Sequence, residues 1–168
     1  LKLKKKELSS RESKPFSIVP AARDRDLPLS YAQQRFWFFD QLDPGKGIYS
    51  RPAAIRLSGH LNVEVLRRSL NEVMRRHEAL RTVFPAEDGR PRQVIEAPRP
   101  VTLAIVDLRS LSDSEKLESI RQHLKEEARE PFDLTAGPMI RFKLLGLGPE
   151  EHILIFTVHH MVSDGWST

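Results

Sequence analysis

The feature that most constrains the fold is the run from His152 to His160, a strongly apolar segment of strand length. Such a run predicts a strand that other layers of the protein cover on both faces. It ends in two adjacent histidines, His159 and His160, and successive side chains of a strand point to opposite faces. Only one imidazole can therefore face a given cavity, and the other needs a hydrogen-bond partner in the opposite layer.

Capping patterns predict the helices of those layers, because a polar side chain that accepts a hydrogen bond from free N–H groups favours a helix start. Apolar residues recur at helical spacing after the second and third starts, which gives each helix one buried face. The starts are Ser30 with Gln33, Asn62, and Ser112 with Glu115, and the predicted helices run from Tyr31 to about Leu42, from Asn62 to about Arg81, and from Ser112 to Pro131. The predicted buried faces are Leu66, Leu70, Val73, Met74 and His77, then Leu117, Ile120, Leu124 and Ala128.

Short apolar or alternating segments predict further strands. Ile140, Phe142 and Leu144 alternate with Arg141 and Lys143, which is the pattern of a half-buried strand. Together the elements predict an α/β fold, an α+β two-layer sandwich in which long helices pack on a mixed sheet. The other predicted strands are 53–57, 92–96 and 101–107.

Residues 1–26 are interpreted as a flexible basic linker, and ordered structure is expected over 27–168. Residues 1–14 carry six Lys or Arg against two Glu, so this segment alone accounts for the formal net charge of +4. A basic segment can bind nucleic acid or acidic lipid, but no aromatic residue lies in this one to stack on bases. We expect neither a nucleic-acid partner nor a membrane, because no stretch nears the roughly 20 apolar residues of a spanning helix.

The residue types present also narrow the chemistry. The chain has no cysteine, which excludes disulfides, cysteine nucleophiles and thiolate metal sites and fits a cytoplasmic protein. No metal is expected at the histidine pair, because adjacent strand histidines do not converge on one ion. No bound cofactor is expected, because a glycine-rich phosphate loop is lacking. Ser163 and Ser167 lie outside any Gly-x-Ser-x-Gly elbow, which argues against an acyl-serine intermediate.

Asp164 follows His160 by four residues, in a turn that Gly165 permits. An aspartate beside an imidazole can orient the ring and stabilise imidazolium, or it can pair with an arginine and hold the loop in shape. The spacing leaves both roles open. A lone histidine on an apolar strand is more often a core residue, whereas one at a strand end that opens onto a cleft suits base chemistry near neutral pH.

Four segments, in order along the chain, resemble the motifs of condensation domains of non-ribosomal peptide synthetases. The last resembles their active-site motif, whose His-His-x-x-x-Asp-Gly core is shared with a wider superfamily that includes chloramphenicol acetyltransferase. The second matches its motif almost letter for letter. Phe36 and Phe39 stand where a smaller apolar residue is more usual, and we interpret both as packing changes. The four segments are 29–38, 76–84, 131–138 and 159–167.

The resemblance implies a two-lobed fold, each lobe like chloramphenicol acetyltransferase. This chain would be the N-terminal lobe, truncated after the histidine motif and inactive without the second lobe. The implied reaction joins a donor acyl or peptidyl thioester to an acceptor aminoacyl thioester. Both substrates would be carried on 4′-phosphopantetheine by upstream and downstream peptidyl carrier domains, with an adenylation domain in the same synthetase. The first segment favours the subtype that joins an L-configured donor to an L-configured acceptor.

By the same resemblance, His160 is the residue nearest the chemistry. It would act either as the general base for the acceptor amine or as the group that positions this amine. Gly165 is expected to allow the tight turn and to present its N–H near the reacting carbonyl.

The remaining residues of the motifs are expected to support the site. His159 is interpreted as structural, and Asp164 as holding the loop through an arginine, for which Arg81 and Arg76 are the candidates. Two alternatives stay open: an acyltransferase of the same superfamily that uses a free acceptor, and a non-catalytic recruitment domain that keeps the fold and binds another enzyme.

Overall fold

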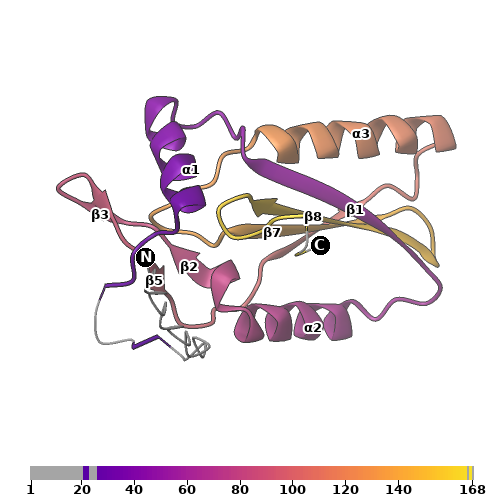
Figure 1. The fold of residues 1–168 in the computed structure, drawn as a ribbon. Coiled ribbons are helices and arrows are strands. Elements are labelled where there is room, and N and C mark those ends of the chain that lie inside the picture. The colour runs from indigo at the N-terminus through magenta and orange to yellow at the C-terminus, as the bar shows by residue number, and fades with distance from the viewer. Residues whose placement is uncertain (1–20, 23–25, 166, 168) are drawn as a thin grey trace, which may run out of the picture.

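A computed structural model of the chain describes residues 21–22, 26–165 and 167. Most of the predicted linker, 1–26, lies outside the described residues. A four-stranded sheet is covered on one face by α3 (Asp113–Arg129) and on the other by α2 (Val63–Arg76), as Figure 1 shows. Long helices on a mixed sheet confirm the predicted fold class. The arrangement has three layers where two were predicted, because the central strands bury side chains on both faces.

The sheet has the strand order β1-β8-β7-β6. β1 pairs with β8 and β8 with β7 in antiparallel fashion, whereas β7 and β6 are parallel. A parallel pair needs a long crossover, and α3 provides it between β6 and β7. These strands confirm the predictions, with ends that differ by a few residues. Their bounds are β1 Ser50–Ser58, β6 Leu103–Asp107, β7 Ile140–Gly146 and β8 Glu151–His159.

Smaller elements surround the end of the sheet where β8 stops. The hairpin of β3 and β4 turns at Asp88 and Gly89, whose φ angles of 50° and 73° suit a tight two-residue turn. The predicted strand 92–96 is only two residues long, because its partner strand is equally short. The small elements are α1 Tyr31–Leu42, a 3₁₀ turn Glu78–Arg81, β2 Thr82–Val83, β3 Ala86–Glu87, β4 Arg90–Pro91 and β5 Val94–Ile95.

The helix starts follow their caps, but one helix end does not match. In α1 the Gln33 N–H donates to Ser30 Oγ at 3.2 Å, and the Ser30 N–H donates to Gln33 Oε1 at 2.9 Å. The second helix ends at Arg76, so the predicted end near Arg81 is wrong. His77 leaves the helical conformation at φ −103° and ψ 95°, and a 3₁₀ turn follows.

Two of the predicted buried faces are narrower than expected. In α2, Leu70 and Met74 are buried, but Val73 is 40% exposed. His77 is also exposed, and Leu117 in α3 is 49% exposed, so these three positions were predicted wrongly. In the described part of the chain, no helix has the length and apolar character needed to cross a membrane.

Candidate active site

The two histidines separate at the end of β8, as alternation predicts. His159 is the last residue of the strand and only 4% exposed, and it lies edge-on to the rings of Tyr49 and Phe132, with centroids 6.1 and 5.7 Å away. Its Nδ1 accepts a hydrogen bond from the Met161 N–H at 3.2 Å. This is the buried partner that the sequence required.

The surroundings of His159 favour a neutral ring. Burial, reinforced by the nearby His160 and Arg141, lowers the pKa of His159 from 6.5 to about 4. Because Nδ1 accepts, the single proton of the neutral ring sits on Nε2. A neutral, enclosed imidazole suits a structural role better than proton transfer.

His160 lies one residue beyond the strand and is half-buried. Its backbone N–H donates to the Tyr49 carbonyl at 3.0 Å, and its Nδ1 lies 2.8 Å from the Ser163 carbonyl oxygen. A carbonyl can only accept, so Nδ1 carries the proton. In the neutral ring, Nε2 therefore keeps its lone pair for another group.

A second ring contacts His160 from the far end of the chain. The ring of Phe36, in α1, stacks on the imidazole with a centroid distance of 5.0 Å and an interplanar angle of 23°. The same phenyl ring meets Tyr49 edge-on at 4.9 Å. No local spacing could indicate this contact. The only signal in the sequence was the unusual size of residue 36.

The loop after the histidines is closed by Ser167. Its Oγ–H donates to Asp164 Oδ1 at 2.8 Å and its N–H donates to the Asp164 carbonyl at 3.1 Å, while the Asp164 N–H donates to Ser167 Oγ at 3.2 Å. Gly165 has no left-handed φ, and a Cβ there would meet no atom within 4 Å. Neither backbone strain nor crowding in the described loop therefore requires glycine.

The described contacts of the two candidate arginines are with residues other than those of the histidine loop. Arg76 is exposed, and its Nε donates to Glu72 Oε1 at 2.6 Å. Arg81 is mostly buried; its Nη1 donates to the Glu96 carbonyl, and its Nη2 lies 3.7 Å from Glu78. These three contacts hold the arginines within their own region of the fold. The pairing of either one with Asp164 stays a prediction.

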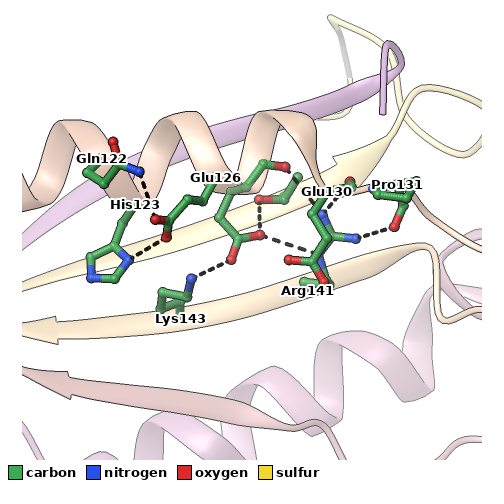
Figure 2. A network of polar contacts seen from close by, with 9 residues as sticks. Gln122, His123, Glu126, Glu130, Pro131, Arg141 and Lys143 are labelled. Carbon is green, nitrogen blue, oxygen red and sulfur yellow. Dashed lines mark hydrogen bonds and ion pairs between the residues drawn. The ribbon is translucent and has the colours of Figure 1, made fainter. Parts of the chain in front are cut away.

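Behind His159, a charged network joins α3 to the sheet (Figure 2). Glu127 is only 4% exposed, with Oε1 2.8 Å from Lys143 Nζ. Its Oε2 accepts from Thr157 Oγ1 at 3.0 Å and from Arg141 Nε at 3.3 Å. Burial alone would raise the pKa of Glu127, but Lys143, Thr157 and Arg141 together outweigh burial and lower the pKa.

Arg141 links this network to the histidines. It donates to the carbonyl oxygens of Glu130 at 2.9 Å and Pro131 at 3.0 Å, where α3 ends. Its guanidinium lies 4.0 Å from the centroid of Phe132, the ring that packs against His159. The alternation in this strand indicated that Arg141 was half-exposed, and it gave no sign of this network.

The described residues hold no group of three or more His, Asp or Glu side chains able to bind a metal ion. The titratable residues that accompany His160 in its motif are His159 and the loop residue Asp164, which differ in burial and in partners. The described residues therefore offer one imidazole nitrogen, His160 Nε2, that this tautomer leaves unprotonated, beside a second imidazole that remains neutral.

Comparisons with known proteins show the family of the chain. Residues 23–168 match the family model of the condensation domain. The chain is 43% identical over 150 residues to a linear gramicidin synthase of Brevibacillus parabrevis, covering 89% of this chain and 2% of that protein. It is 43% identical over 155 residues to the phosphinothricin tripeptide synthetase PhsC of Streptomyces viridochromogenes, covering 91% of this chain and 14% of the relative.

Solved structures share the fold. The starter condensation domain of rhizomide synthetase RzmA has a TM-score of 0.76 at 25% identity, and the first condensation domain of the calcium-dependent antibiotic synthetase, solved with a substrate analogue, has 0.75 at 28%. Each comparison covers 84% of this chain and 34% of the other. The chain thus spans a small part of its curated relatives and about a third of these structures. By its match over residues 23–168, it belongs to the condensation-domain family.

Proposed function

We propose that this chain is the histidine-bearing lobe of a condensation domain that forms amide bonds in non-ribosomal peptide synthesis. The donor is an acyl or peptidyl thioester and the acceptor is an aminoacyl thioester. Each is carried on the 4′-phosphopantetheine of a peptidyl carrier domain, in a cytoplasmic synthetase that also holds an adenylation domain. The support is the family match and relatives that are peptide synthetases. The second lobe completes the active domain.

The observation that carries this proposal is the state of the His160 ring. The Ser163 carbonyl accepts the hydrogen bond that Nδ1–H donates, so the lone pair of Nε2 can accept a hydrogen bond from the acceptor amine. The amine nitrogen attacks the thioester carbonyl carbon, the new C–N bond forms and the C–S bond breaks. The amine gives up one proton to Nε2, and this proton then leaves with the departing thiol.

The neighbouring residues would assist in different ways. The depressed pKa of His159 keeps that ring neutral, so a proton taken up by His160 meets no second positive imidazole. Asp164 shapes the loop through Ser167. Gly165 would present its N–H to the oxyanion that forms at the carbonyl, in the space that a side chain would otherwise enter.

The test uses the parent synthetase with both lobes and both carriers loaded, and follows the dipeptidyl thioester on the downstream carrier by mass spectrometry. We expect His160→Ala to lower kcat by about 100-fold or more, since positioned acid–base groups contribute that much. The matched control His60→Ala removes an exposed histidine and should leave the rate unchanged. Equal rates for wild type and His160→Ala would remove His160 from the chemistry.

Two further outcomes separate the alternatives. A free amine that replaces the acceptor carrier at an equal rate would favour an acyltransferase with a free acceptor. A wild-type protein that makes no product from verified loaded carriers, but retains another enzyme in a pull-down, would favour the recruitment domain. Either outcome would contradict the proposed condensation.

A further inference from the structure

We infer that Phe36 is a positioning residue for His160, which rests on the proposed function of that histidine. Phe36 belongs to α1, near the start of the described chain, and His160 lies near its end. Their rings are nearly parallel, at 23°, with centroids 5.0 Å apart. Aromatic rings at this separation attract each other beyond their burial, so the contact favours one orientation of the imidazole.

The stack restricts a motion of the His160 ring that its hydrogen bonds still allow. The bond to Tyr49 fixes the backbone, and the bond from Nδ1 to Ser163 fixes one corner of the ring. A hydrogen bond tolerates a range of distances and angles, so the ring can still rotate by small amounts about χ1 and χ2, and this rotation moves Nε2. A flat surface against one face of the ring limits this rotation and so sets the direction of the Nε2 lone pair.

Phe36 is itself held in place by α1. Gln33 lies one turn earlier on the same helix face, and its Nε2 donates to the Met161 carbonyl at 3.2 Å. Two residues of one helix face thus contact two consecutive residues of the histidine loop. Phe36 also meets the ring of Tyr49 edge-on, and Tyr49 is the residue that accepts the His160 backbone N–H. The helix, the loop and the residue just before β1 therefore meet around one imidazole.

The first arm of the test measures turnover in the parent synthetase with loaded carriers. We expect Phe36→Leu to lower kcat about tenfold with little change in KM for either carrier. A small misorientation of the His160 ring should slow the reaction without weakening the binding of the carriers. Phe36→Tyr keeps the flat ring and should retain most of the rate. The matched control Phe38→Leu makes the same change on the same helix at a residue that is 54% exposed, and should behave as wild type.

The second arm does not depend on turnover. The protein is labelled with ¹³C at histidine Cε1, and the His160 resonance is identified by its loss in His160→Ala. A phenyl ring shifts nuclei above its face upfield, so this resonance should move downfield in Phe36→Leu and stay in place in Phe38→Leu. Thermal unfolding of each variant shows whether the fold is intact.

The two measurements distinguish a failure of the Phe36 inference from a failure of the proposed function. A His160 resonance that does not move in Phe36→Leu would overturn the stack, whether or not the protein makes peptide. A moved resonance with unchanged kcat would overturn the positioning role. Equal loss of kcat in Phe36→Leu and Phe36→Tyr would also overturn it. Failure of the proposed function would appear instead as wild-type protein without product.

Discussion

The two faces of the central sheet are closed in different ways. On the face toward α2, the contacts are apolar: Leu70 and Met74 pack against Phe142, Leu144 and Leu154. On the face toward α3, apolar residues are joined by the buried carboxylate of Glu127 with its cationic partners. The second face reaches His159, through Arg141 and Phe132.

The two faces should therefore respond differently to mutation. The stability of an apolar face depends on how well its side chains fill the space. When a side chain there is shortened, the loss of stability grows with the cavity that is left. The stability of a charged face depends on every buried charge keeping its partner, because removal of one charged group leaves the others buried and uncompensated. His159 therefore lies on the face that tolerates partial change least.

The largest expected effect is on the charged face. Glu127→Ala should lower the free energy of unfolding by about 4 kcal/mol, because Arg141 and Lys143 lose their carboxylate. Denaturant unfolding of the complete domain measures this loss. The matched control Glu118→Ala, at an exposed residue of the same helix that faces the exposed Arg121, should change the stability far less. Equal losses in the two variants would show that the network adds nothing.

The apolar face gives the second effect. Leu144→Ala should lower the free energy of unfolding by about 3 kcal/mol, since Leu144 is only 1% exposed and its loss leaves a cavity. Ile105→Ala, at the paired position of β6, removes a side chain that is 56% exposed. It should cost much less in the same denaturant titration. A loss for Leu144→Ala that exceeds that of Glu127→Ala would reverse the comparison.

The smallest effect is a pH dependence that belongs to the charged face alone. The folded-state pKa of His159 is about 4, below its ordinary value of 6.5, so the unfolded chain takes up the proton first as the pH falls. The stability is therefore intact above pH 6.5 and declines toward pH 4, with a loss of about 2 kcal/mol by pH 5. Denaturant unfolding at pH 8 and pH 5 measures this decline.

The control for this dependence is His159→Asn. Its amide oxygen can accept from the Met161 N–H in place of Nδ1, but the side chain does not titrate. The loss of stability between pH 8 and pH 5 should be smaller by about 2 kcal/mol in this variant. An unchanged loss would assign the acid sensitivity to other groups.

Local signals in the sequence predicted much of the fold. The start and end of α1 follow from the Ser30 cap and the Asp43-Pro44-Gly45 break, and the separation of the two histidines follows from strand alternation. The end of α2 could not be predicted, because no proline or glycine marks it. The two-residue strands β2 and β5 exist only because their partners lie close in space.

The candidate site divides in the same way. The histidine motif is contiguous, so its residues could be predicted from one segment. The contacts of Phe36 with His160 and of Arg141 with Glu127 join segments far apart in the chain, and neither has a local signature. Arg76 and Arg81 were predicted to serve Asp164 from resemblance alone, and their described contacts are with residues of their own region.

The bond between His160 Nδ1 and Ser163 has a consequence for variation at the site. The acceptor is a main-chain carbonyl, which every amino acid supplies. A change of side chain at position 163 cannot delete that acceptor. Most single-residue replacements there should therefore leave the protonation pattern of the imidazole unchanged. Only changes in the course of the backbone, such as an inserted or deleted residue between 160 and 163, would remove it. Position 163 can thus vary in sequence while Nδ1 of the imidazole keeps its acceptor and Nε2 keeps its lone pair.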